Sequence, residues 1–139
     1  MKEALKEAQK AFHEDEVPVG CVIVCENKII GKGHNLTEKL TDVTAHAEMQ
    51  AITAAANFLG AKYLTECTMY VTVEPCVMCA GAIFWSQLGK LVFAASDEKR
   101  GFTKVGNLLH PKTELIKGVY EKEAGELMST FFKKLRELN

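Results

Sequence analysis

Two short segments of the chain hold the residue types and spacing that a catalytic metal site requires. Cys76 and Cys79 lie three positions apart at the expected start of a helix, so both sulfurs reach one side and are close enough to share a tetrahedral zinc ion. Free backbone N–H groups at a helix start favour the thiolate form of such cysteines. His46, at the head of another expected helix, supplies a third ligand and leaves the fourth position for water, as in catalytic zinc sites.

Glu48 follows His46 by two positions and is expected to handle protons at this site. Residues two apart on a regular helix do not share a face, so both approach one metal ion only where the backbone is entering the helix. Thr44, a good N-cap residue, predicts the helix start there. Because two thiolates cancel the charge of Zn²⁺, the ion should be a weaker acid toward its water. We therefore expect Glu48 to shuttle a proton from that water to a substrate.

Other interpretations of the same residues remain open at this point. The Cys76–Cys79 spacing after a strand also fits a thioredoxin-like redox pair, which would leave His46 and Glu48 without a role. A closed structural zinc site would need a fourth ligand, for which the candidates are Cys21, Cys25, Cys67 and His34. We expect those three cysteines to be buried as small apolar residues, and His13 and His34 to lie on the surface or in loops.

Hydrophobic patterning around these segments predicts alternating helices and strands. Apolar residues at helical spacing predict helices over 2–14, 44–60, 76–87 and 121–138. Runs rich in β-branched residues predict strands over 19–24, 28–31, 68–74, 90–95 and 113–119. The polar stretch Cys25-Glu26-Asn27 predicts a hairpin between the first two strands. Alternation of this kind indicates an α/β protein in which helices cover both faces of a sheet.

Length and composition indicate an ordinary folded protein. With 139 residues, 47% of them hydrophobic and 25% charged, we expect one domain over 1–139 and no disordered tract. No apolar run approaches the ~20 residues that cross a bilayer, and the N-terminus lacks the apolar block of a secretory signal, so an intracellular, cytoplasmic protein is expected. The net charge of −1 gives no global sign of a nucleic-acid binder, so any RNA must be held by a local patch.

The arrangement H-x-E followed by P-C-x-x-C is a signature of zinc-dependent nucleobase deaminases. Along nearly its whole length the sequence resembles bacterial tRNA-specific adenosine deaminases. The resemblance is carried by EVPVG (16–20), GHN (33–35), DVTAHAE (42–48), YVTVEPCVMCAGA (70–82), SDEKRG (96–101) and FFKK (131–134). It implies a cytidine-deaminase-like, three-layer α/β/α sandwich with a mixed five-stranded sheet. It also implies a homodimer and conversion of the wobble adenosine of a tRNA anticodon to inosine.

Residue by residue, the resemblance makes His46, Cys76 and Cys79 the ligands of one Zn²⁺ per chain. It makes Glu48 the proton shuttle, in agreement with the reasoning from spacing. The remaining expected contacts are to the substrate, the tRNA anticodon stem-loop, and involve Asn35, Asp97, Val17 and Ala47. Alternatives stay open for three of them: Asn35 would equally cap a turn, Asp97 would be solvated, and Val17 would pack in the core.

Two alternative functions are carried forward. One is deamination of a free base or nucleoside of the guanine or cytosine type, because Ile83-Phe84-Trp85-Ser86-Gln87 has some similarity to guanine deaminases. The other is a non-catalytic, zinc-stabilised binding subunit, against which the complete set of His46, Glu48, Cys76 and Cys79 argues.

Overall fold

The computed structural model describes residues 1–138, whose centre is a mixed five-stranded sheet. Its strands are β1 (Gly20–Cys25), β2 (Lys28–His34), β3 (Thr68–Val73), β4 (Lys90–Ala95) and β5 (Glu114–Lys117). The strands lie in the order β2-β1-β3-β4-β5. β1 is antiparallel to both of its neighbours, whereas β3, β4 and β5 are parallel. The predicted mixed sheet is confirmed, and β2 continues three residues past its predicted end at Gly31.

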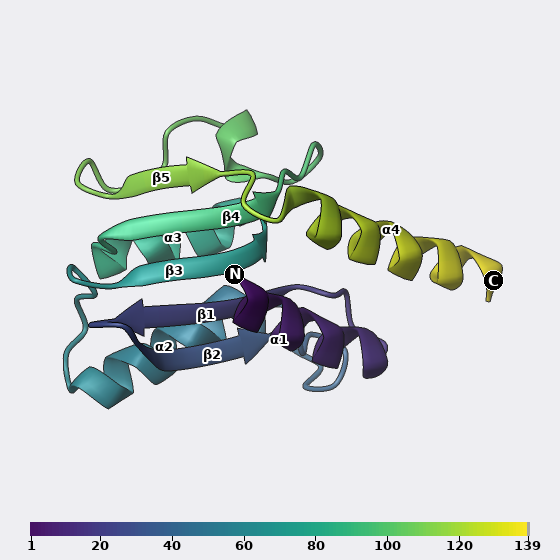
Figure 1. Ribbon diagram of the computed structural model, residues 1–139, viewed down its shortest axis with the longest axis horizontal. Helices are drawn as coiled ribbons and strands as arrows, with labels where there is room; N and C mark the ends of the chain where they lie inside the picture. The colour runs from purple at the N-terminus through teal and green to yellow at the C-terminus, as the bar shows by residue number, and fades with distance from the viewer. Residues whose placement is uncertain (139) are drawn as a thin grey trace.

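Helices cover both faces of the sheet, which confirms the predicted three-layer α/β/α arrangement. They are α1 (Lys2–His13), α2 (Ala47–Leu59), α3 (Val77–Ser86) and α4 (Glu121–Glu137), with a short 3-10 turn, η1 (Phe102–Lys104). In Figure 1, α1 lies in front of the sheet and α2 and α3 lie behind it, whereas α4 extends to the right beyond the ends of the strands; α4 packs against β4, β3 and α1. Such burial on both sides requires apolar residues at nearly every position of the central strands, and β4 is buried from Leu91 to Ala95. None of the helices described in residues 1–138 could span a bilayer.

The hairpin between β1 and β2 is tighter than the sequence suggested. Cys25 still belongs to β1, and the turn consists of Glu26 and Asn27, with φ angles of 51° and 62°. Positive φ at both central residues is typical of the type I′ turn, whose twist matches that of the strands it joins.

The start of α2 differs from the prediction by two residues. Thr44 does not cap the helix, because its hydroxyl and its N–H both donate to Asp42 Oδ1, at 2.7 and 2.8 Å. His46 is the N-cap instead, in an extended conformation with φ −76° and ψ 155°. The helix ends at Gly60 as predicted, in the left-handed conformation with φ 64°.

The topology brings several chain segments to one edge of the sheet. The parallel strands β3 and β4 end there, β2 ends there, and β1 begins there because it is antiparallel to both β2 and β3. This edge is on the right of Figure 1. The connections from β2 to α2 and from β3 to α3 leave from it, so the starts of both helices lie beside it.

Gly20, at the start of β1, is a position where α1 approaches the strand without room for a side chain. A Cβ atom there would overlap the Ala4 carbonyl oxygen and the Ala8 nitrogen, both of which are backbone atoms. We expect Gly20→Ala to lower the free energy of unfolding by about 1–3 kcal/mol in urea titrations.

Gly125 in α4 provides the matched control, because a Cβ atom there meets nothing within 4 Å. Gly125→Ala should raise the free energy of unfolding by about 0.5–1 kcal/mol, since alanine loses less backbone entropy in a helix. A Gly20→Ala protein as stable as the parent would show that α1 does not pack as closely as described.

Candidate metal centre

His46 is positioned by the side chain of Gln50, one turn further along α2. Gln50 Nε2 donates to the His34 carbonyl at 2.7 Å and also approaches the carbonyls of Ala45 and His46, at 3.2 and 3.3 Å. One amide group therefore ties the end of β2 to the residues that enter α2. Because His46 is still extended while Glu48 is within the first helical turn, both residues are able to approach one point, as the spacing argument required.

Cys76 and Cys79 occupy the start of α3. Cys76 is the N-cap, with an extended ψ of 175°, and its carbonyl accepts the first helical hydrogen bond from the Ala80 N–H at 2.8 Å. Cys79 is inside the first turn and fully buried. The helix therefore begins one residue later than predicted, and both sulfurs lie where unpaired N–H groups and the positive end of the helix dipole favour thiolate.

The structure brings His46, Cys76 and Cys79 together. His46 Nδ1 lies 3.6 Å from Cys76 Sγ and 3.5 Å from Cys79 Sγ, and the three donor atoms all lie within 4.8 Å of one another. A tetrahedral zinc ion with ordinary Zn–S and Zn–N bonds separates a sulfur from a nitrogen by about 3.6 Å. The donor set thus fits zinc in both its chemistry and its spacing.

The candidate fourth ligands do not join this group. Among residues 1–138 the group consists of those three side chains, without Cys21, Cys25, Cys67 or His34. The His34 ring instead lies between two carboxylates, with Nδ1 3.4 Å from Glu7 and Nε2 3.2 Å from Glu14. Cys21 and Cys67 are buried as expected, whereas Cys25 is half-buried. The arrangement therefore offers a metal three protein ligands, which favours a catalytic site over a closed structural one.

The side chains of the site shift one another's pKa values. Burial raises the pKa of Glu48, which is 3% exposed, to about 7. A hydrogen bond from Cys79 lowers the pKa of Cys76 to about 4, and the same bond raises the pKa of Cys79. A hydrogen bond to Cys76 raises the pKa of His46. A divalent cation would change this balance, because it favours the deprotonated form of every ligand.

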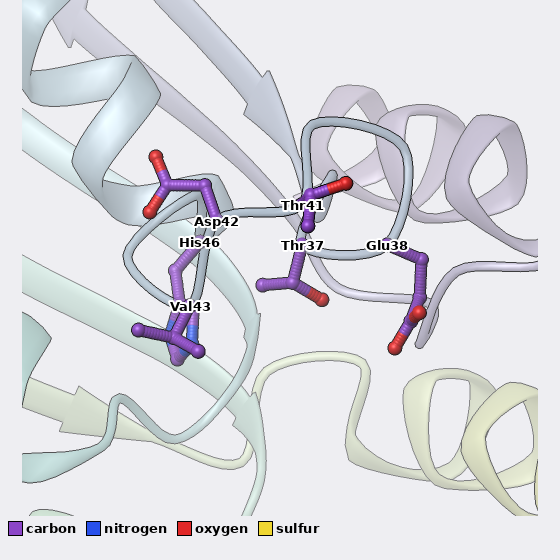
Figure 2. A pocket seen from close by; sticks show the side chains of 6 residues that line it. All are labelled: Thr37, Glu38, Thr41, Asp42, Val43 and His46. Atoms are coloured by element: carbon purple, nitrogen blue, oxygen red, sulfur yellow. The ribbon is translucent and has the colours of Figure 1, made fainter.

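An open hollow of ≈ 420 Å³ lies beside His46. Figure 2 shows its lining side chains around the bend of the loop between β2 and α2: Thr37, Glu38, Thr41, Asp42, Val43 and His46. Asn35 begins this loop and is buried, with its Oδ1 accepting the Thr37 N–H at 3.4 Å. Asn35 N also donates to the Val19 carbonyl at 3.1 Å, so the half-buried Val17 segment runs alongside.

The other two expected substrate contacts, Asp97 and Ala47, have local structural roles. Asp97 follows β4, and its Oδ1 accepts the N–H groups of Lys99 and Arg100, both at 3.0 Å. Ala47 is fully buried in the hydrophobic core, which leaves only its backbone for a substrate. Substrate contacts by Asn35, Asp97, Val17 and Ala47 stay predictions.

Two buried carboxylates that the sequence did not single out hold the loops at this edge. Glu16 is fully buried and accepts the N–H groups of Glu38 and Lys39, at 3.0 and 2.7 Å. Glu74 is 5% exposed and accepts three hydrogen bonds from the loop after β4. In the sequence, each of these glutamates stands next to an apolar stretch that contains a proline, Glu16-Val17-Pro18 and Glu74-Pro75. A glutamate in such a stretch indicates a buried carboxylate, and a buried carboxylate requires hydrogen-bond donors.

Comparisons with known proteins agree with this geometry. The model of the MafB19-like deaminase family matches residues 1–136. The tRNA-specific adenosine deaminase of Aquifex aeolicus is 50% identical, over 98% of this chain and 93% of that protein. A structure from a study of A-to-I editing by tRNA:A34 deaminases at the wobble position of transfer RNA superposes with a TM-score of 0.85. It is 38% identical, over 91% of this chain and 96% of that chain. A guanine deaminase from Bacillus subtilis gives a TM-score of 0.65 and is 39% identical, over 68% of this chain and 61% of that chain.

Proposed function

The chain belongs to the MafB19-like deaminase family and to the tRNA-specific adenosine deaminases, and we propose that it deaminates the wobble adenosine of a tRNA anticodon to inosine. The reaction consumes one water molecule per adenosine and releases ammonia. We place the protein in the cytoplasm, where tRNA is used, and treat residues 1–139 as one deaminase domain.

The observation that carries the proposal is a buried carboxylate beside a three-donor metal group at the starts of two helices. His46 and Glu48 lie at the start of α2, and Cys76 and Cys79 lie at the start of α3. The three donors meet beside one edge of the sheet, and Glu48 joins them through a hydrogen bond with Cys79. A cation with three protein ligands keeps a position for substrate or water, and a group able to carry a proton lies next to it. Hydrolytic removal of an amino group requires these two features, a metal ion that can activate water and a side chain that transfers protons.

In the mechanism that we propose, His46, Cys76 and Cys79 hold one zinc ion per chain. When bound, zinc would lower the pKa of a water molecule and so supply a nucleophile near neutral pH. Glu48 takes the proton that this water loses and donates it to N1 of the adenine ring as oxygen adds to C6. Glu48 then takes the second proton from the oxygen on C6 and passes it to the amino group. The C6–N bond breaks as the C6=O bond forms, and ammonia leaves. Burial disfavours the charged carboxylate and so raises the pKa of Glu48, which suits a group that must both accept and donate a proton.

The substrate contacts that we propose surround this centre. Asn35 donates a hydrogen bond to the flipped nucleotide, Val17 and the Ala47 backbone wall the base, and Asp97 lies beside the ribose or the RNA backbone. Unpaired anticodon bases enter such a pocket with little unstacking. The exposed side chains of Lys99 and Arg100, next to Asp97, supply the local positive charge that the overall net charge of −1 does not.

We also propose that the active form is a homodimer joined through α3. The helix reads VMCAGAIFWS, without a charged residue. Trp85 is 76% exposed and Val77 is 48% exposed, so an apolar face lies open next to the metal ligands that the same helix carries. Exposed apolar surface without charges is typical of the centre of a homodimer interface.

Trp85→Lys tests the dimer. We expect the parent protein to sediment as a dimer and the variant to sediment mostly as a monomer, because a lysine at the centre of an apolar interface must be desolvated. Phe58→Lys, which changes a 55% exposed aromatic residue near the end of α2, serves as the control for surface charge. A parent protein that sediments as a monomer at micromolar concentration would contradict this interface.

The substrate class is tested by offering the zinc-loaded protein three substrates in parallel: an anticodon stem-loop with adenosine at the wobble position, free guanine and cytidine. We expect only the RNA to be deaminated. The similarity to the guanine deaminase makes consumption of guanine with unchanged RNA the specific outcome that would favour the alternative function. Failure of all three substrates with zinc bound would favour a non-catalytic, zinc-stabilised subunit.

A further inference from the structure

Glu74 is a buried carboxylate that has no role in the chemistry proposed above. It follows β3 directly and precedes Pro75 and Cys76. Its Oε1 accepts the Asp97 N–H at 3.1 Å, and its Oε2 accepts the Thr103 N–H at 3.0 Å and the Thr103 hydroxyl at 2.7 Å. All three donors belong to the loop from 97 to 103, so one carboxylate binds both ends of that loop.

The loop is folded closely around this carboxylate. A Cβ atom at Gly101 would overlap the carboxylate of Glu74, so the loop backbone passes directly over it. Gly101 N donates to the Asp97 carbonyl and Phe102 N donates to the Pro75 carbonyl, both at 3.0 Å. Phe102 itself is 1% exposed. The loop is thereby attached to the segment that leads into the metal ligands of α3.

The tip of the loop presents two cationic side chains in a fixed turn. Asp97 Oδ1 accepts the N–H groups of both Lys99 and Arg100, which holds their backbones in place while their side chains stay exposed. This gives Asp97 a structural role in the turn. Glu74 fixes the base of the loop and Asp97 shapes its tip, so the backbone that carries the two cations is held in place before any partner binds.

We propose that Glu74 is a positioning residue for RNA binding: its carboxylate fixes loop 97–103 against the metal segment and so places Lys99 and Arg100 against the RNA backbone. The inference rests on the proposed function. An ordered loop binds more tightly than a mobile one, because its conformational entropy is already lost. Hydrogen bonds to a charged acceptor are strong enough to impose that order.

The test compares Glu74→Gln with Glu98→Gln, a matched control whose 79% exposed side chain lies on the same loop. The glutamine amide turns an N–H donor toward N–H donors, so at least one hydrogen bond is lost. We expect Glu74→Gln to raise KM for the wobble-adenosine stem-loop about tenfold, with kcat within about twofold of the parent and zinc content unchanged. Glu98→Gln should leave KM within about twofold of the parent.

A variant that lacks both cations of the loop tip shows whether Glu74 acts through them. Lys99→Ala with Arg100→Ala should reduce the slope of log KM against log salt concentration by about two, roughly one for each phosphate contact. In that background Glu74→Gln should change KM by less than about threefold, because the groups that it positions are gone. An undiminished tenfold effect there would overturn the proposal, as would a Glu74→Gln protein whose KM matches that of Glu98→Gln.

Thr103→Val and Thr103→Ser keep the proposal testable if Glu74→Gln does not fold. The valine removes only the hydroxyl that donates to Glu74, and the serine retains it. We expect KM to rise about threefold for valine and to return to the parent value for serine. Equal KM values for the two variants would overturn the proposal.

Amide hydrogen exchange measures the loop without RNA or turnover. The Asp97 and Thr103 amides should exchange slowly in the parent and at least about tenfold faster in Glu74→Gln. Unchanged exchange would overturn the positioning role even if the parent deaminates RNA. A parent that leaves the RNA unaltered, with the predicted change in exchange, would instead overturn the proposed function and the RNA contact while the loop remains fixed by Glu74.

Discussion

Replacing Glu48 with glutamine is expected to lower kcat for deamination by about 10²–10⁴-fold while the chain still binds zinc. Glutamine matches the shape of glutamate but does not carry a proton between the water and the purine ring. Glu48 is 3% exposed and sits among the side chains of the metal group, so water from bulk solvent has little access to take over that task. The measurement is single-turnover inosine formation, with zinc determined on the same samples.

Glu26→Gln, at the exposed hairpin turn on the opposite edge of the sheet, is the matched control and should keep the parent rate. If Glu48→Gln retained more than about a tenth of the parent kcat, another group would have to carry the proton, since one general acid–base contributes at least ~10²-fold. If the variant also lost its zinc, Glu48 would be needed to build the site, and the rate alone would not identify a proton shuttle.

Removing Cys79 is expected to have the second large effect. Cys79→Ala takes away one of three donors from a fully buried position, so zinc content should fall well below one ion per chain and activity should fall by about 10³-fold or more. Loss of the ligand also leaves Cys76 and His46 without the cation that favours their deprotonated forms. The zinc content is measured by mass spectrometry after gel filtration. The activity is measured as inosine formation in the stem-loop.

Cys67→Ala is the control, because Cys67 is also buried but lies outside the metal group. It should retain zinc and activity. The parent should lose activity on treatment with a strong chelator and regain it when zinc is returned. A Cys79→Ala protein with full zinc content would mean that the ion is bound elsewhere, and a chelated parent that remained active would exclude zinc from the reaction.

The secondary structure could be predicted from local patterns because each element buries a regular set of positions. The strand over 90–95, which is apolar from Leu91 to Ala95, has the predicted bounds, and Gly60 ends α2 as its freedom at positive φ suggests. The start of α2 could not be placed as well. Thr44 has the side chain of an N-cap, but Asp42, two residues earlier, accepts both of its donors. Such local competition does not appear in the hydrophobic pattern.

The metal group was predictable because its spacing reflects short-range geometry. Cys76 and Cys79 lie within one helical turn. His46 and Glu48 are two positions apart, so their side chains approach one point only where the chain enters a helix. Glu16 and Glu74 were not predicted, because their hydrogen-bond donors lie 22 to 29 residues further along the chain. No periodicity in the sequence encodes which backbone N–H groups will meet a buried carboxylate, so only the folded structure reveals those partners.

The roles expected for the substrate contacts depend on resemblance more than on physics, and the structure explains why. Asn35 and Asp97 both accept backbone hydrogen bonds in turns. A turn was the alternative interpretation for Asn35, whereas a solvated side chain was the alternative for Asp97. A residue that shapes a loop and a residue that binds a ligand have the same sequence pattern, since turns and binding sites both favour short polar side chains. Mutation with separate measurements of KM and kcat distinguishes the two roles.

Isotope transfer at the wobble nucleotide shows whether this chain adds oxygen from water to adenosine in RNA. The zinc-loaded protein is incubated with an anticodon stem-loop in ¹⁸O-labelled water, and the RNA is then digested and analysed by mass spectrometry. We expect inosine at the wobble position with ¹⁸O on its base, all other adenosines unchanged, and no product with Glu48→Gln. RNA that keeps its wobble adenosine in the presence of zinc-loaded protein, or inosine that carries no label, would contradict the proposed function.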